Sequence, residues 1–313
     1  MTPAADAASA DTTADEALPR AFGPYMLLTR LARGGMGEVF FAKHGGLQGF
    51  EKHCVVKTLR EDLASTSEYV RRFTEEARVV VQLSHRNVCS VFDVGRAEGR
   101  LYVAMEHVAG RDLRALLVRG PLSPAVSVHI VSEVLEALDY AHRMVDGDTD
   151  APLALVHRDV SPHNILVGVE GDVKLIDFGI ATSARVGPVT EEGTVLGKLT
   201  YMAPEHARGD PVDGRADQYS AAVVLVELLT GVTFSDGLSR DEAWAISGIG
   251  GHRPKAYAAL DAQLRTILDR ALEPKRERRF PTCSMFGEAI VEWARARGHV
   301  ADARDVRRLV TQQ

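Results

Sequence analysis

The sequence predicts an α+β fold of two lobes, in which a small strand-rich lobe with one helix is followed by a larger, mainly helical lobe. Two observations predict it. Short β-branched and aromatic segments separated by glycine-rich turns fill residues 25–59 and 89–108, whereas helical patterns dominate after residue 108. The length of 313 residues, with 45% hydrophobic and 26% charged residues, is sufficient for a well-buried core.

The expected boundaries follow changes in composition along the chain. Residues 1–20 are rich in Ala, Asp and Thr and have almost no large apolar side chains, so we expect a disordered tail. The small lobe then occupies residues 21–107 and the large lobe residues 108–297. Residues 298–313 form a C-terminal helical tail, which we expect to pack on the large lobe.

The small lobe is expected to begin with three antiparallel strands, in the segments YMLLTRLA, EVFFAKH and HCVVKTL. One helix follows from residue 67, because apolar residues recur at positions 70, 73, 77 and 80. The segments CSVFDVGRAEG and RLYVAMEHV predict two further strands, which complete this lobe.

The large lobe contains five segments with helical patterns. They are residues 111–120, 123–144, 216–231, 262–272 and 283–297. The longest apolar run in the chain, residues 219–232, is too short to span a bilayer and includes Glu227. We therefore interpret this run as a buried helix of a globular domain.

Composition and charge limit the classes of partner and compartment. The net charge of −6 provides no basic surface for nucleic acid or anionic lipid. The N-terminus lacks the basic start and apolar core of a signal peptide. Cys54, Cys89 and Cys283 lie far apart without metal-ligand spacing, which is typical of buried thiols in a reducing compartment. We therefore expect a cytoplasmic protein that does not bind nucleic acid.

Two features of the small lobe are candidates for binding phosphate. Gly34, Gly35 and Gly37 lie between two strands, where glycine lets backbone N–H groups approach an anion, although a plain hairpin turn has the same pattern. Lys57 lies among apolar residues on a strand, with Glu76 on the next helix as its candidate partner. Taken singly, a lysine that points to water and a solvated helix glutamate explain these two residues equally well.

A candidate base and two candidate metal ligands follow in the large lobe, within VHRDVSPHNILV at 156–167 and DFG at 177–179. With the features above and APE at 203–205, these motifs resemble the protein kinase family in order and spacing. The matching elements are the glycine loop, Lys57, Glu76, His157-Arg158-Asp159, Asn164, Asp177-Phe178-Gly179 and Ala203-Pro204-Glu205. The resemblance covers about residues 21–297 and is to bacterial relatives of eukaryotic serine/threonine kinases.

The resemblance implies a two-lobed fold, ATP and Mg²⁺ as cofactors, and a role for each matching residue. Lys57, paired with Glu76, would hold the α and β phosphates, Asn164 and Asp177 would bind Mg²⁺, and Asp159 would orient the substrate hydroxyl and accept its proton. The residues that the resemblance assigns to the nucleotide site are Leu31, Gly34, Gly35, Gly37, Val39, Val55, Lys57, Met105, Glu106, Val108, Asp112, Leu166 and Asp177.

The resemblance also implies structural and regulatory contacts. Glu205 is expected to pair with Arg279, and Asp217 to anchor the backbone of the catalytic loop. Arg158 is of the kind that binds a phosphate on the activation segment, for which Thr194 is the first candidate and Thr190 the second. A polar surface loop without a regulatory role is the alternative for these threonines.

One position departs from the family pattern. Ser161 stands two residues after Asp159, where serine/threonine kinases carry a lysine, and Lys198 follows Gly197, where they carry a threonine. We infer that the two residues have exchanged roles, so that Lys198 supplies the charge near Asp159 and Ser161 the hydroxyl. An unrelated solvent-facing lysine is the alternative.

These observations predict an ATP- and Mg²⁺-dependent protein kinase that acts on serine and threonine in protein substrates, with tyrosine as a less favoured acceptor. The family also allows a dimer for trans-autophosphorylation. Two alternatives of other classes stay open, a pseudokinase and a small-molecule kinase. The intact Lys57, Asn164 and Asp177 argue against the first, and the APE segment with Arg279 argues against the second.

Overall fold

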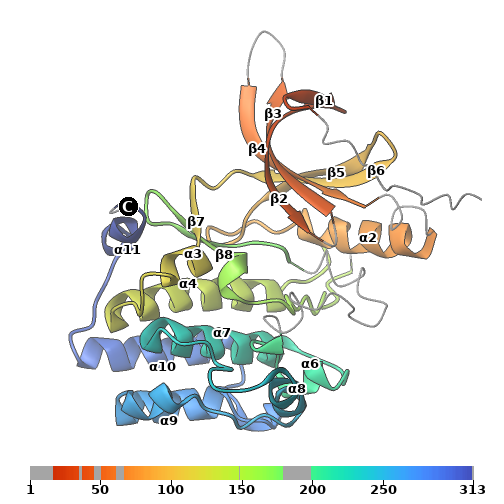
Figure 1. Cartoon of the computed structure of the whole chain (residues 1–313). Helices are drawn as coiled ribbons and strands as arrows, with labels where there is room; N and C mark the ends of the chain where they lie inside the picture. The colour runs from red at the N-terminus through yellow and green to blue at the C-terminus, as the bar shows by residue number, and fades with distance from the viewer. Residues whose placement is uncertain are drawn as a thin grey trace, which may run out of the picture.

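The chain folds into a twisted sheet with one helix above a group of helices (Figure 1). The computed structural model describes residues 17–34, 37–45, 51–60, 67–147, 149–178 and 199–311, and the side chains of residues 68, 69, 72, 76 and 240 lie outside this description. The two-lobed α+β fold predicted from the sequence is confirmed.

The small lobe is a six-stranded antiparallel sheet in the order β1-β2-β3-β4-β6-β5. Its strands are β1 (Arg20–Phe22), β2 (Tyr25–Gly34), β3 (Gly37–Gly45), β4 (Glu51–Leu59), β5 (Val91–Ala97) and β6 (Arg100–Glu106). The predicted helix is α2 (Ser67–Val80), and its apolar positions Phe73, Ala77 and Val80 are buried as expected. The edge strand β1 was not predicted, and it begins at Arg20, the last residue of the expected tail.

Strand alternation gives this sheet two different faces. Cys54 and Val56 of β4 belong to a small apolar cluster on one face. Val55, on the opposite face, packs with Met105 against the main core of the protein. Lys57 is two residues beyond Val55 and therefore lies on the face toward α2 and the large lobe.

The large lobe is built around helix α7 (Gly214–Thr230), in which residues 216–228 are all buried. A helix buried on all sides has a core position, so the prediction of a buried helix is confirmed, although the helix ends at Thr230 rather than at residue 232. The other helices of this lobe are α3 (Leu113–Leu117), α4 (Pro124–His142), α6 (Pro204–Ala207), α8 (Arg240–Ile249), α9 (Ala262–Ala271), α10 (Cys283–Ala296) and α11 (Ala303–Thr311). The described residues also include the 3₁₀ turns η2 (Pro162–Asn164), η4 (Lys255–Ala259) and η5 (Arg276–Arg278).

A second sheet, which the sequence pattern did not predict, lies where the lobes meet. It consists of β7 (Gly110–Asp112), β8 (Ile165–Gly168) and β9 (Val173–Leu175), and all its pairings are antiparallel. The helix expected at 111–120 is therefore shorter, because its first two residues pair with β8 and Asp112 caps α3 instead.

Candidate active site

The loop of residues 156–164, which carries the predicted catalytic groups, is anchored by the buried carboxylate of Asp217. This carboxylate accepts hydrogen bonds from the backbone N–H groups of His157 and Arg158, each at 2.8 Å, and lies 2.8 Å from His142 Nε2. Burial opposes ionisation of Asp217, but its contacts with His142 and His157 outweigh burial and lower the pKa of the carboxyl group. The predicted anchoring contact is confirmed.

The two predicted metal ligands meet at the end of this loop. Asn164 Nδ2 donates to the carbonyl oxygen of Asp159 at 2.7 Å, which fixes the side chain and makes its Oδ1 the atom available to a cation. The carbonyl of Asn164 accepts a hydrogen bond from the N–H of Ile176 at 2.9 Å, and Asp177 is the next residue. Asp159, Asn164 and Asp177 are therefore neighbours in the fold.

Lys57 forms its ion pair with Asp177, at 2.7 Å between Nζ and Oδ2. This pair joins β4 of the small lobe to the large lobe, with the lysine side chain 19% exposed and the aspartate side chain 25% exposed. The side chain of Glu76, the predicted partner, lies outside the described residues, so its pairing with Lys57 stays a prediction. A lysine that points into solvent is excluded by this geometry.

Two residues of the site have left-handed backbones that favour glycine. Arg158 has φ of 66° and Asp177 has φ of 64°, and each such residue costs about 1–3 kcal/mol. Asp217 holds the first through its hydrogen bond to the N–H of Arg158. The second is held because Phe178 is buried edge-on against His157, with ring centroids 4.5 Å apart. The chain therefore maintains local strain where its predicted catalytic groups converge.

The segment that joins the lobes is held by contacts on both sides of Glu106. Its N–H donates to the Ser90 carbonyl at 2.9 Å, and its carboxylate accepts from the Ser90 N–H at 2.8 Å and from Lys174 Nζ at 2.7 Å. Met105, before it, is 7% exposed. Asp112, which the family resemblance assigns to the nucleotide site, caps α3 by accepting from the Ala115 N–H at 2.8 Å.

The apolar residues predicted to contact the nucleotide lie on either side of this joining segment. Val39 pairs directly with Lys57 across the β3–β4 ladder, so it shares the face of the sheet that carries the lysine. Leu166 pairs with Asp112 and with Lys174 in the second sheet. A nucleotide bound between the lobes would contact Val39 on one side and Leu166 on the other.

The glycine loop is described only in part, since Gly35 lies outside the described residues. Gly34 pairs with Gly37 at the tip of the β2–β3 hairpin, and a side chain at Gly34 would meet open space. At Gly37 a Cβ atom would lie 1.9 Å from the Thr58 carbonyl oxygen, so packing against β4 alone requires glycine there. The role of the loop in binding phosphate stays a prediction.

The residues present fit a magnesium ion. The candidate ligands are a carboxylate and an amide oxygen, the hard donors that Mg²⁺ prefers. Among the described residues there is no cluster of three or more His, Cys, Asp or Glu side chains that could hold a metal. Mg²⁺ typically binds through one or two protein carboxylates plus substrate phosphates rather than in such a cage.

A broad groove between α4 and α10 is a separate feature of the large lobe. It is lined by His129, Tyr140 and His299 among others, and none of the predicted site residues borders it. The convergent polar groups around Asp159 and Asp177, rather than this groove, therefore define the candidate active site.

Comparison with known proteins decides the family. The sequence pattern of the family described as "Protein kinase domain" matches residues 25–287. The chain belongs to the protein kinase family. It is 38% identical over 279 residues to the tyrosine-protein kinase MasK of Myxococcus xanthus, and this match covers 86% of the chain and 43% of MasK. It is also 42% identical over 213 residues to the serine/threonine-protein kinase PknD of Mycobacterium tuberculosis, covering 67% of the chain and 30% of PknD.

A solved structure shows the same fold. The PknI kinase domain of M. tuberculosis superposes with a TM-score of 0.68 at 31% identity, and the match covers 89% of this chain and 99% of that domain. The chain spans less than half the length of MasK and of PknD. The matched region is therefore the kinase domain that these longer relatives share.

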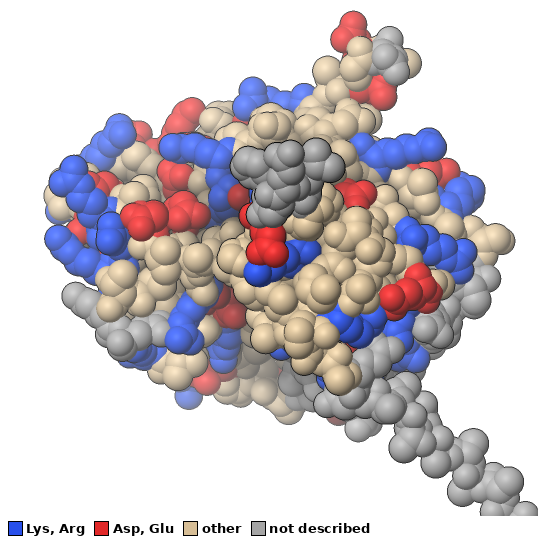
Figure 2. Space-filling model, turned by 90° about the horizontal axis from the view of Figure 1, so that it is seen from above, with Lys and Arg blue, Asp and Glu red and all other residues tan. Residues whose placement is uncertain are grey.

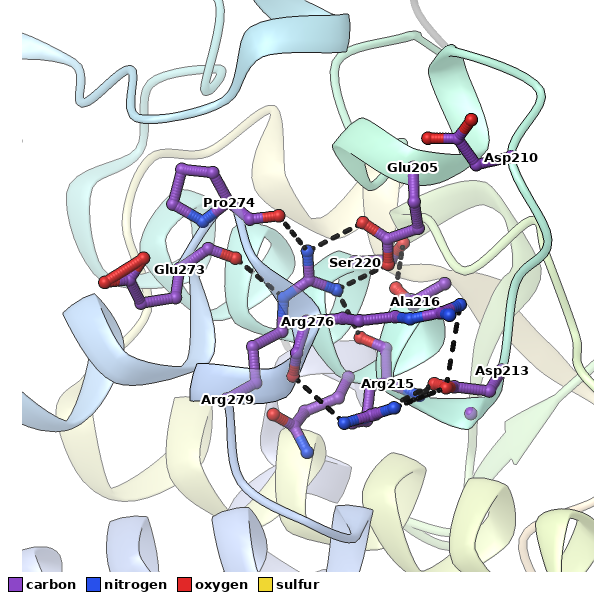
Figure 3. Close-up of polar contacts among 12 residues, drawn as sticks. Glu205, Asp210, Asp213, Arg215, Ala216, Ser220, Glu273, Pro274, Arg276 and Arg279 are labelled. Atoms are coloured by element: carbon purple, nitrogen blue, oxygen red, sulfur yellow. Dashed lines mark hydrogen bonds and ion pairs between the residues drawn. The ribbon is translucent and has the colours of Figure 1, made fainter.

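The APE segment of this kinase domain is fixed by a buried ion pair, as predicted. Arg279 Nη1 and Nη2 bind the two carboxylate oxygens of Glu205 at 2.6 and 2.8 Å. Figure 3 shows the same guanidinium donating to the backbone carbonyls of Glu273, Pro274 and Arg215, so Nε, Nη1 and Nη2 all have hydrogen-bond partners. Both side chains are almost fully buried.

A second buried network was missed from the sequence. Glu227 of α7 accepts hydrogen bonds from Arg114 at 2.7 Å and from the hydroxyl of Tyr201, which lies just before the APE segment. Burial raises the pKa of Glu227 and also that of Tyr201. The signal for it was Glu227 itself, because a glutamate inside an apolar run requires buried partners.

The structure tests only some of the predicted regulatory and exchanged residues. Thr190, Thr194 and Lys198 fall outside the described residues, so their roles stay predictions. Arg158, just before Asp159, is exposed, and Ser161, two residues after it, is buried with 4% of its surface exposed. The three cysteines are free and buried, as expected.

Surface and membrane features are simple in the described part of the chain. On the face seen in Figure 2, basic and acidic side chains are interspersed rather than gathered by sign. No helix in the described ranges has the length and apolar character that crossing a membrane requires.

Proposed function

We propose that this chain is an ATP- and Mg²⁺-dependent protein kinase that transfers the γ-phosphate of ATP to serine and threonine hydroxyls of proteins. The observation that carries the proposal is the Lys57–Asp177 ion pair at 2.7 Å, which joins the two lobes next to Asn164 and Asp159. A cation, two oxygen ligands and a carboxylate base in one place are the groups that phosphoryl transfer requires.

In the proposed reaction, Lys57 holds the α and β phosphates, while Asn164 and Asp177 bind the metal. When bound, Mg²⁺ neutralises charge on the phosphate oxygens. Asp159 orients the acceptor hydroxyl and accepts its proton as the oxygen bonds to the γ-phosphorus and the bond to ADP breaks. The Asp217 anchor keeps the loop in place, so positioning and charge carry the rate.

The acceptor hydroxyl is the part of the proposal on which the names of the relatives differ. PknD and PrkC of Bacillus subtilis are named serine/threonine kinases, whereas MasK is named a tyrosine kinase. Acid hydrolysis of a protein acceptor labelled with [γ-³²P]ATP, followed by separation of the phosphoamino acids, tests the proposal. We expect phosphoserine and phosphothreonine, and label confined to phosphotyrosine would contradict it.

The activation segment is proposed to be phosphorylated at Thr194. Arg158 is exposed and lies beside the catalytic Asp159, where it is available to a phosphate on that segment. We expect active protein to carry phosphate on Thr194, and a Thr194→Ala variant to have lower activity than a Thr190→Ala variant. Peptide mapping by mass spectrometry tests this, and a fully active enzyme with unmodified Thr194 would contradict it.

Lys198 and Ser161 are proposed to have exchanged roles relative to other serine/threonine kinases. Ser161 is buried two residues after Asp159, and a lysine in a buried position needs an anion. We expect Lys198→Thr and Ser161→Lys each to lower turnover steeply, and the double variant to recover much of it. Steady-state rates of the four proteins test this, and additive losses would refute the exchange.

We also infer a cytoplasmic location, which the three free buried thiols support. Protein substrates are the expected partners, and a dimer for trans-autophosphorylation is the further assembly that we propose. Labelling of a catalytically inactive copy by an active one would test that assembly.

A further inference from the structure

Helix α11 touches the end of a hairpin whose other end carries both candidate metal ligands. The hairpin consists of β8 and β9. Asn164 directly precedes β8, and Asp177 follows β9 by two residues. The hydrogen bond from the Ile176 N–H to the Asn164 carbonyl closes this open end at 2.9 Å.

The turn at the opposite end, residues 169–172, packs directly against the start of α11. A Cβ atom at Gly171 would lie 1.8 Å from the carbonyl oxygen of Ala303, so the two backbones are in contact. Beside it, Arg307 of α11 forms an ion pair with Glu170 at 3.0 Å. Figure 1 shows this turn, in green, next to the dark blue helix.

Helix α11 is itself firmly seated on the large lobe. Val306 is fully buried, and Leu309 and Val310 pack against the main core at the three- and four-residue spacing of a helix face. Asp302 caps the helix by accepting from the N–H groups of Arg304 and Asp305. The family pattern matches residues 25–287, so α11 lies beyond the matched residues.

The hairpin between these two ends is too well packed to bend independently. Ile165, Val167, Val173 and Leu175 are all at most 1% exposed. Leu175 also bonds through its backbone to the Asn87 carbonyl and the Cys89 N–H, at 2.8 and 2.9 Å. A displacement at the turn is therefore transmitted along the strands, because close-packed interiors pass strain on.

We propose that α11 is a positioning element for the metal site, which sets the position of the β8–β9 hairpin and thereby the position of Asn164 and Asp177 relative to the rest of the site. The proposal rests on the proposed kinase function. It assigns to α11 no contact with nucleotide or metal, and it predicts that disturbing the contact of Gly171 with Ala303 weakens metal-dependent nucleotide binding specifically.

The test compares Gly171→Ala with Gly237→Ala. Both glycines have left-handed backbones, with φ of 87° and 79°, but a Cβ atom at Gly237 would meet open space, so the second variant controls for backbone strain alone. The dissociation constant of ADP is measured by calorimetry with Mg²⁺ and with EDTA. The dissociation constant in EDTA divided by that with Mg²⁺ reports the contribution of the metal site.

For Gly171→Ala we expect this ratio to fall about tenfold, the usual effect of disturbing groups that orient metal ligands. ADP binding in EDTA should stay unchanged, and Gly237→Ala should match the wild type. A lower melting temperature of Gly171→Ala with an unchanged ratio would overturn the proposal, because a purely structural role for α11 predicts that result.

A second variant, Val306→Ala, keeps the test decisive if Gly171→Ala does not fold. It loosens α11 from the core without straining the turn, and we expect the same fall in the ratio, to a smaller extent. An unchanged ratio in folded Val306→Ala would also overturn the proposal. If the wild type itself gained no affinity from Mg²⁺, the kinase function would fail, and the role of α11 with it.

Discussion

Replacing Lys57 by methionine is expected to lower the rate of phosphoryl transfer by about 10²–10³-fold or more while the protein stays folded. The lysine supplies the cation of the site, through the ion pair that joins β4 to Asp177. Its side chain and that of Asp177 are both partly exposed, so water can solvate the carboxylate that the substitution leaves behind. Transfer of labelled phosphate to a protein acceptor measures the rate, and circular dichroism the fold.

The matched control for this substitution is Lys43→Met. Lys43 lies in the same sheet and also forms an ion pair, with Glu51 at 2.6 Å, but that pair is on the surface. We expect its loss to leave the rate and the stability nearly unchanged, because exposed pairs contribute about 0–1 kcal/mol. A Lys57→Met enzyme with turnover within about tenfold of the wild type would refute the assignment of Lys57.

The largest expected effect on stability belongs to Arg279→Met. The substitution leaves the carboxylate of Glu205 buried without its partner, which costs about 3–5 kcal/mol in free energy of unfolding. Urea titration measures the loss. The control is Arg71→Met, which breaks the exposed ion pair with Glu75 within α2 and should cost about 0.3–0.5 kcal/mol.

The reason for that loss can be separated from lost packing. Replacing both partners, Glu205→Leu with Arg279→Met, removes the unpaired charge, and the double variant should be more stable than Arg279→Met alone. If the double variant were less stable than the wild type by the sum of the losses of the two single variants, the buried charge would not be the cause.

The parts of the fold that the sequence predicted are those with a long, regular pattern. The apolar spacing in α2 and the continuous apolar run in α7 identify each helix from its own residues. Strands β8 and β9 have four and three residues and no such pattern, so they were missed. They exist because β7 pairs with one side of β8 and β9 with the other.

The candidate site shows the same limit at the level of side chains. Motif order, through the resemblance to the kinase family, predicted Lys57, Asp159, Asn164 and Asp177 as site residues. The direct contact of Lys57 with Asp177 depends on a left-handed turn at Asp177, which one sequence does not reveal. Asp112 likewise became a helix cap because α3 begins directly after it.

Incubating the purified protein with [γ-³²P]ATP, Mg²⁺ and a generic protein acceptor, beside Asp177→Asn, tests the catalytic assignment most directly. Asp177 pairs with Lys57 and is a candidate metal ligand, so we expect label on the acceptor with the wild type and almost none with the variant. Calorimetry with ATP, carried out in parallel, shows whether each protein still binds nucleotide. Wild-type protein that binds ATP with Mg²⁺ but transfers no label would contradict the catalytic role and favour a nucleotide-binding pseudokinase.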